Sequence, residues 1–177
     1  MGRRGLKASE FTFDTQLRMS QGVATSASVE EILLSAIAGA GQVRRATTGE
    51  DRNGTDWWVD LPVGHSLSVD LKARTVDWKE RGEDDLALET WSIVESGVLG
   101  WTLNLEKRTD YILWWWQDTG RWCLVPFPML RTVFSEMLPE WSEKYKVRRQ
   151  QTDGRYHSEC VFVPRRVVWA AIYKRFA

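Results

Sequence analysis

Asp56, Asp70 and Lys72, which lie between Gly54 and Arg74, are residues of the types that metal-dependent hydrolysis of phosphate esters requires. Asp56 precedes one apolar run, and Asp70 and Lys72 lie two residues apart in the next, SLSVDLKAR. Because side chains alternate along a strand, Asp70 and Lys72 share one face. A hairpin of the two runs would make Asp56 and Asp70 neighbours. Such carboxylates suit Mg²⁺ or Mn²⁺, and Lys72 would stabilise charge beside the attacking water.

Three other acids compete for a place in this site. Asp60 points the same way as Asp56 along DWWVD, but Asp56 has the glycine-containing context GTD and is preferred. Asp110 precedes the run YILWWW and is interpreted as a residue that starts or caps a strand. Glu89 lies in a third strand-like run, where a buried acid needs a partner, so it is either a site residue or half of a structural ion pair. The polar face as a whole is either a site or an ordinary solvated strand face.

The composition narrows the function classes. Lysine plus arginine and aspartate plus glutamate both number 24 in 177 residues, so the chain has no net charge to attract a polyanion globally. The two histidines form no cluster with cysteine, which argues against a zinc site. Cys123 and Cys160 lie in apolar runs and are expected to be reduced, as in a cytoplasmic protein. No apolar run is long enough to span a bilayer, and the first residues lack the apolar segment of a secretory signal.

The elements that must position the candidate site follow from changes of period along the chain. Residues 28–40 have helical spacing with Val29, Ile32 and Leu33 on one face. Strands are expected at QVRRAT, at DWWVDLP and SLSVDLKAR as a hairpin, and at LALETWSIV. A second hairpin joins DYILWWWQD to RWCLVPF, and a helix follows from Pro128 to about Lys144. KVRRQQTDGR is expected to be an exposed loop, before a last strand and a terminal helix.

Eleven tryptophans are more readily explained by core packing than by ligand stacking. In the run YILWWWQD, Trp114 and Trp116 are expected to face one side of the sheet and Trp115 the other. These elements predict one α/β domain with a mixed central sheet flanked by helices. Its parts are a helical extension at 1–27, a core at 28–130 and a helix-strand-helix segment at 131–177.

The spacing of Gly54-Thr55-Asp56, then thirteen residues, then Asp70-Leu71-Lys72, resembles the signature of the PD-(D/E)xK nuclease superfamily. It is most similar to the RecB-like and Holliday-junction-resolvase-like branches, and it departs from the pattern in having Thr55 where proline is usual. The order of elements over residues 28–130 also resembles that family's restriction-endonuclease-like core, with a helix, a three-stranded meander, a helix and a strand. Small phage or mobile-element nucleases are the proteins that this resemblance suggests.

The resemblance implies a role for each matching residue. Asp56, Asp70 and the Leu71 carbonyl would bind Mg²⁺ or Mn²⁺, with Glu31, or its neighbour Glu30, as an acid from the preceding helix. Lys72 would be the catalytic lysine.

The implied function is metal-dependent hydrolysis of DNA, and a homo-oligomer or a protein partner is possible. The alternative is a catalytically silent module on the same fold that binds nucleic acid or a protein. Scattered basic residues could contact phosphates or could simply be solvated; they are Arg44, Arg45, Arg52, Arg74, Lys79, Arg81, Arg148, Arg149, Arg165 and Arg166.

Overall fold

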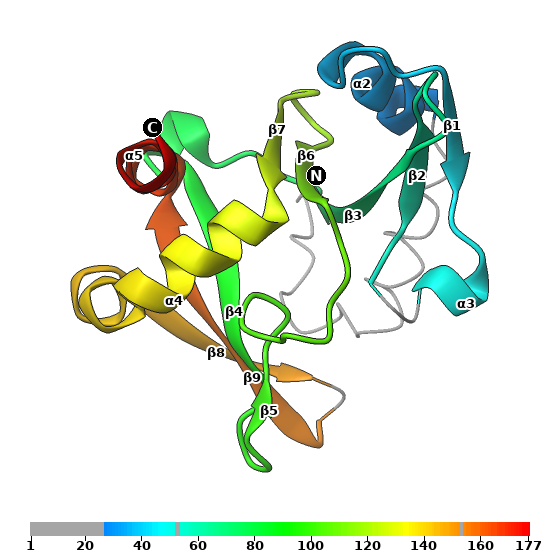
Figure 1. Ribbon diagram of the computed structural model, residues 1–177. Helices are drawn as coiled ribbons and strands as arrows, with labels where there is room; N and C mark the ends of the chain where they lie inside the picture. Colours follow the sequence, from blue (N-terminus) through cyan, green and yellow to red (C-terminus); the bar gives the residue numbers. More distant parts are fainter. Residues whose placement is uncertain (1–26, 52–53, 153) are drawn as a thin grey trace, which may run out of the picture.

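The computed structural model describes residues 27–51, 54–152 and 154–177, which form two β-sheets with helices around them (Figure 1). The expected helical extension at 1–27 lies outside the described residues, apart from Ala27. The helices are α2 (Ala27–Ala36), α3 (Thr48–Asp51), the 3₁₀ helix η1 (Lys79–Arg81), α4 (Phe127–Lys144) and α5 (Arg165–Phe176). The strands are β1 (Gln42–Arg45), β2 (Trp57–Asp60), β3 (Ser66–Arg74), β4 (Asp85–Ile93), β5 (Val98–Leu99), β6 (Tyr111–Trp116), β7 (Trp122–Pro126), β8 (Lys146–Thr152) and β9 (Tyr156–Pro164).

The first sheet has five strands in the order β1-β2-β3-β6-β7, and it contains both predicted hairpins. β2 and β3 are antiparallel with Trp57 opposite Val69, and β6 and β7 are antiparallel with Trp114 opposite Cys123. β3 and β6 run parallel, with Lys72 opposite Trp114. The sheet is therefore mixed, as the sequence predicts.

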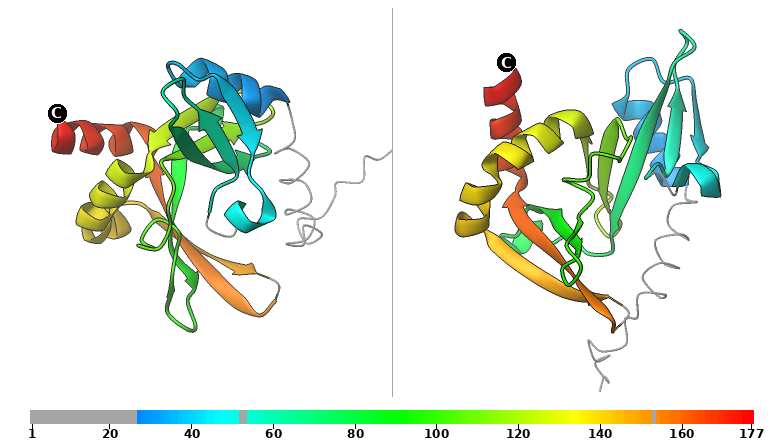
Figure 2. Two further views of the ribbon diagram at one scale, coloured as in Figure 1. Left: turned by 45° about the vertical axis from the view of Figure 1, so that its right-hand side comes forward. Right: turned by 60° about the horizontal axis from the view of Figure 1, so that its bottom comes forward.

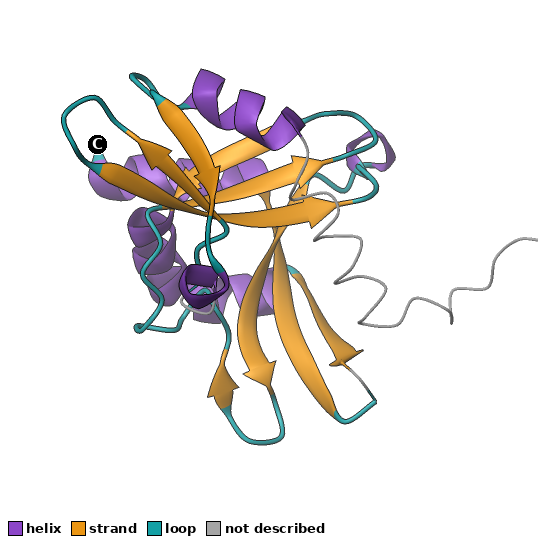
Figure 3. Cartoon of the chain, turned by 90° about the vertical axis from the view of Figure 1, so that its right-hand side faces the viewer, coloured by secondary structure: helices purple, strands orange, loops and turns teal. Residues whose placement is uncertain are grey.

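The expected three-stranded meander is wrong in its third member. After β3 the chain leaves the first sheet, and β4 pairs with β5 and β9 in a second sheet of order β5-β4-β9-β8. β6 takes the place beside β3 that β4 was expected to occupy. The strand directions of the two sheets differ clearly, and α2 lies above the five-stranded sheet in Figure 3.

The segment 146–152, expected to be a loop, is the edge strand β8. It pairs antiparallel with β9 from Lys146 opposite Phe162 to Thr152 opposite Tyr156. Its sequence, KVRRQQT, does not show the apolar alternation of a half-buried strand, because its side chains are largely exposed. Charged residues on an edge strand also discourage pairing with other chains. The segment after residue 130 is accordingly helix-strand-strand-helix.

The two faces of the five-stranded sheet are covered by different parts of the chain. Val29 and Leu33 of α2 are fully buried in a cluster that includes Val69 and Trp115. The opposite face packs with β4, β9, α4 and α5 through a second cluster that includes Trp114 and Trp116. α4 and α5 lie side by side, on the side of the molecule away from α3 (Figure 2). The predicted division of the tryptophan triplet between two faces is confirmed.

A cluster of two acids and two arginines, which we call the Arg121 network, joins the β3–β4 connection to β7 and α5. The Arg121 guanidinium binds both oxygens of Asp77, at 2.6 and 2.7 Å, and also contacts Asp84 at 2.7 Å. Arg165 binds the same Asp84, at 3.0 Å, and Arg121 lies 3.8 Å from the centroid of the Trp116 ring. These contacts connect the two sheets. None of the described helices combines the length and apolar character needed to cross a membrane.

Candidate active site

Pairing of β2 with β3 brings Asp56 and Asp70 together. Trp57 pairs with Val69, so the next pair along the two strands is Asp56 and Asp70, and the Asp56 amide donates to the Val69 carbonyl at 2.9 Å. The two aspartates are therefore adjacent on one face. The Leu71 amide donates to Asp56 Oδ2 at 2.6 Å. This is the arrangement that the hairpin predicts.

Asp56 has an acidity far from that of an ordinary aspartate. Burial and the negative charge of Asp70 raise the pKa of Asp56 to about 7. The Leu71 amide and the charge of Lys72 act in the opposite direction. Asp56 is therefore protonated over much of the pH range below neutrality, whereas Asp70 is ionised.

Asp70 is held by two lysines rather than one. Lys72 Nζ and Lys107 Nζ lie 2.8 and 2.7 Å from Asp70 Oδ2, and Asp70 is buried. Burial alone would raise the pKa of Asp70, but the charges of the two lysines in contact with it outweigh burial and hold that pKa below its usual range. Burial would likewise lower the pKa of Lys72, yet Asp70, with smaller contributions from Asp56 and Glu89, raises it. Both groups of this pair therefore carry full charge at neutral pH.

Lys107 is the site residue that sequence reasoning missed. It lies in the connection between β5 and β6, and only 8% of its side chain is exposed. Its Nζ also donates to the Gly54 carbonyl at 3.1 Å, and the Thr109 hydroxyl donates to the same oxygen at 2.6 Å. Gly54 has a φ of +85°, and a Cβ built there would collide with Lys107 Nζ. The glycine that favoured Asp56 over Asp60 is thus required by the second lysine.

Glu89 lies behind Lys72 and supports the loop that borders it. Its Oε2 accepts hydrogen bonds from the Trp101 amide, at 2.9 Å, and the Ser92 hydroxyl, at 2.8 Å. A register shift in β4 between Glu89 and Trp91 lets Ser92 reach the acid, although regular alternation would separate them. The Trp101 ring lies 4.9 Å from Lys72 Nζ. Glu89 therefore positions Trp101 by hydrogen bonds and acts on Lys72 by charge, so its part in the chemistry is indirect.

The remaining candidate acids lie elsewhere. Glu31 is exposed on α2, which packs on the face of the sheet opposite Asp70. Asp60 accepts a hydrogen bond from the Ser66 hydroxyl at 2.6 Å, at the far end of β2 from Asp56. Asp110 Oδ2 accepts from the Ser68 amide and hydroxyl, at 2.8 and 2.7 Å, which fastens the start of β6 to β3 as expected.

The donor set of Asp56 and Asp70 fits a small divalent cation. Both offer hard carboxylate oxygens, and their mutual repulsion, expressed in the raised pKa of Asp56, is what a bound cation would relieve. Over the described ranges, no three side chains of His, Cys, Asp or Glu form a group able to hold a metal ion. Glu31 and Glu89 therefore do not complete a three-acid site with the aspartate pair. Ligands beyond the pair would be water, substrate phosphate or the Leu71 carbonyl, a ligand that stays a prediction.

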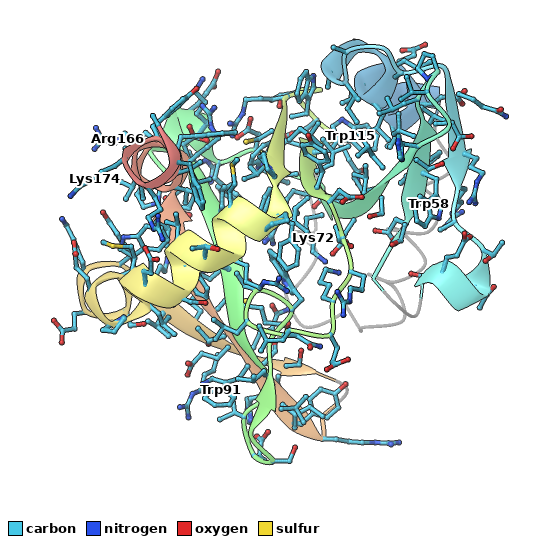
Figure 4. All side chains as sticks on the ribbon, in the orientation of Figure 1. Trp58, Lys72, Trp91, Trp115, Arg166 and Lys174 are labelled. Carbon is cyan, nitrogen blue, oxygen red and sulfur yellow. The ribbon has the colours of Figure 1, made fainter. Side chains whose placement is uncertain are left out.

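Three of the ten basic residues singled out in the sequence serve local ion pairs. Arg44 pairs with Glu50 at 3.0 Å, and Arg149 pairs with Glu159 at 2.8 Å. Arg165 belongs to the Arg121 network. In Figure 4, Lys72 lies in the middle of the molecule, whereas Arg166 and Lys174 of α5 lie at its edge.

Comparison of the chain with protein-family models, with curated proteins and with solved structures gives no match.

Proposed function

We propose that this protein is a metal-dependent nuclease that hydrolyses phosphodiester bonds of DNA. The observation that carries the proposal is the pair of adjacent carboxylates on β2 and β3 with Lys72 on the same face. Two acids and a lysine in this arrangement are the groups needed to bind Mg²⁺ or Mn²⁺ and to stabilise charge on a reacting phosphate. The spacing that resembles the PD-(D/E)xK superfamily supports the same conclusion. The two free cysteines fit a cytoplasmic protein.

Each residue has a distinct role in this proposal. Asp56 and Asp70 would bind the cation, which, when bound, would acidify a coordinated water and offset charge on the phosphate. Asp56 must release its proton for this, so binding is favoured as the pH rises through about 7. Lys72, fully charged, donates toward the attacking water and the phosphate oxygens. Lys107 keeps Asp70 ionised and in place, and Glu89 holds Trp101 against Lys72.

The test is cleavage of linear, circular, single-stranded and branched DNA in Mg²⁺ or Mn²⁺. We expect wild type to cut at least one substrate, and Asp56→Asn, Asp70→Asn and Lys72→Met each to lower the rate by about 10²- to 10³-fold or more. Asp60→Asn is the matched control, because Asp60 points to the same face as Asp56 and, among the described hydrogen bonds, its side chain contacts only Ser66. Circular dichroism should show that all variants fold. Intact DNA with wild type in every condition, or undiminished cleavage by Asp70→Asn, would overturn the proposal.

The second candidate is a catalytically silent module of the same architecture that binds nucleic acid or a protein partner. The observation in its favour is that two ammonium groups already contact Asp70 Oδ2, so the cluster is neutralised from within. Exposed Val98 and Leu99 on edge strand β5 and Val147 on edge strand β8 would suit a protein partner or a second copy. A melting temperature that Mg²⁺ and Mn²⁺ leave unchanged would favour this candidate, because a cation that binds only the folded state must raise it.

A further inference from the structure

A pocket of about 730 Å³ opens where the end of β3 meets the second sheet. Its volume lies within the range of roughly 300–1,000 Å³ that suits a small ligand or one part of a larger one. The segment after β3 and the start of β4 form one wall, and β8 and β9 form the other. The residues that the argument uses are Arg74, Trp78, Glu83, Asp85, Arg148 and Phe162.

This pocket continues directly from the proposed catalytic face. Arg74 lines it and lies two residues after Lys72 on β3, so the two side chains share a face. Cys160 also lines it. Burial and the charge of Glu89 raise the pKa of the Cys160 thiol to about 11, against the opposing charges of Arg74 and Lys72. The pocket wall is therefore within electrostatic reach of the catalytic lysine.

Two cations in the pocket are free to bind an anion. Among the described ion pairs, neither Arg74 nor Arg148 has a carboxylate partner, in contrast to Arg149, which pairs with Glu159. Arg148 lies 5.5 Å from the centroid of the Phe162 ring and is exposed to solvent. Unpaired arginines at a pocket mouth are suited to phosphate oxygens.

The segment between β3 and β4, together with the start of β4, offers groups that can recognise a base. Trp78 has 42% of its surface exposed, and an aromatic ring in a pocket can stack on any unpaired base. Glu83 and Asp85 are hydrogen-bond acceptors for exocyclic amino groups of bases, and they would repel a phosphate placed on that side. Bases of an intact duplex are stacked inside the helix and cannot enter such a pocket.

We propose that this pocket binds an unpaired nucleotide, so that the DNA strand on the Asp70–Lys72 face is single-stranded beside the bond to be cut. The inference rests on the proposed nuclease function for its position relative to the scissile phosphate. The Arg74 and Arg148 guanidinium groups hold the phosphate, and Trp78 stacks on the base. A single-stranded segment, a flap or a frayed end is then the preferred substrate.

Binding without cleavage tests this inference separately from the nuclease function. Fluorescence anisotropy would be measured in EDTA with a labelled oligodeoxycytidylate, whose bases carry exocyclic amino groups, and with a blunt hairpin duplex. The single strand would have about 12 nucleotides, within the site sizes known for single-strand grooves. We expect tighter binding to the single strand, weakened about 5- to 10-fold or more by Trp78→Ala and by Arg148→Ala. Arg166→Ala is the matched control, because Arg166 is also exposed but lies on α5. Its affinity should equal that of wild type.

The outcomes separate the two proposals. Equal affinity for the single strand and the duplex, or affinity unchanged by both pocket substitutions, would overturn the pocket assignment whatever the cleavage assay shows. Selective binding that both substitutions weaken would support it, even in a protein that cuts no DNA. Because Trp78 and Arg148 are both exposed, folding is not expected to limit either variant, and circular dichroism would verify this.

Discussion

The Arg121 network and the group Asp56, Asp70, Lys72 and Lys107, which we call the Asp70 cluster, each contain two acidic and two basic side chains. The two groups differ in how their charges are paired. In the Arg121 network each acid has its own guanidinium contacts, and Asp77 is bound through both oxygens. In the Asp70 cluster both lysines contact Asp70, and Asp56 is left beside another carboxylate. The matched pairs of the Arg121 network hold the fold together, whereas the unmatched Asp56 is the group that, under the proposed function, would help to bind a cation.

Arg121→Ala should have the largest effect on the free energy of unfolding. It leaves Asp77, whose side chain is only 4% exposed, without its partner and removes the guanidinium from the Trp116 ring. We expect a loss of about 3–5 kcal/mol, the usual cost of breaking a buried ion pair from one side. Urea unfolding would measure it. Arg175→Ala, which breaks an exposed pair with Glu136, should cost less than about 1 kcal/mol, and equal costs would contradict the comparison.

Asp70→Asn should destabilise the protein less, by about 1–3 kcal/mol, although it removes the partner of two lysines. Without the charge of Asp70, Asp56 can lose its proton and compensate Lys72, which already feels its charge. Cleavage, by contrast, should be lost. The double variant Asp56→Asn/Asp70→Asn tests this compensation. Its loss of unfolding free energy should exceed the sum of the losses in the two single variants. Strict additivity would show that Asp56 does not compensate.

Asp56 and Asp77, one acid from each cluster, should respond to pH in opposite directions. The folded-state pKa of Asp56 is raised to about 7, so the folded protein binds more protons than the unfolded chain between about pH 4 and 7. Asp56 therefore stabilises the fold below pH 4 and loses that contribution as the pH rises through 7, by at most about 1.4 kcal/mol per pH unit. Arg121 lowers the pKa of Asp77, so this contribution is present above the ordinary aspartate pKa and is lost on acidification.

Unfolding curves from pH 4 to 8 would separate the two effects. Asp56→Asn should flatten the decline toward neutral pH, and Asp77→Asn should leave that decline in place. Saturating Mg²⁺ should raise the stability of wild type more at pH 8 than at pH 5, because the cation competes with the Asp56 proton. An unchanged slope in Asp56→Asn would contradict the assignment.

Gly54→Ala should have a smaller effect on stability than Arg121→Ala, about 1 kcal/mol or somewhat more, with a clear loss of cleavage. The substitution strains a backbone with a φ of +85° and pushes Lys107 away from Asp70. Gly64→Ala is the matched control, since Gly64 has a φ of +78° and nothing within 4 Å of the added Cβ. Both should cost similar backbone strain, but only Gly54→Ala should slow cleavage. Equal cleavage activity in the two variants would contradict the role proposed for Lys107.

The sequence predicted the parts of the site that depend on local periodicity. The shared face of Asp70 and Lys72 and the approach of Asp56 follow from alternation and a short hairpin, both of which act over a few residues. The division of Trp114 and Trp115 between two cores follows from the same alternation.

The parts that depend on distant pairing could not be predicted in this way. β4 has the pattern of a buried strand, but nothing local distinguishes β3 from β9 as its partner. β8 is an exposed edge strand, so the pairing that makes it a strand leaves no apolar alternation. Lys107 reaches Asp70 only because β6 pairs with β3, and a lysine in a polar connection carries no signal of that destination.

The parallel pairing of β3 with β6 has a consequence for the rate of folding. In the sequence, β4 and β5 lie between β3 and β6, and β4 pairs with β9, which lies near the other end of the described chain. Contacts between residues so far apart in sequence carry a large loop-closure entropy, which slows the search for the native topology. Refolding should therefore proceed from the β2–β3 and β6–β7 hairpins, with the aspartate pair formed early. Lys107 would reach Asp70 only after β6 has paired with β3. The proposed cleavage activity should therefore recover more slowly than the β-structure during refolding.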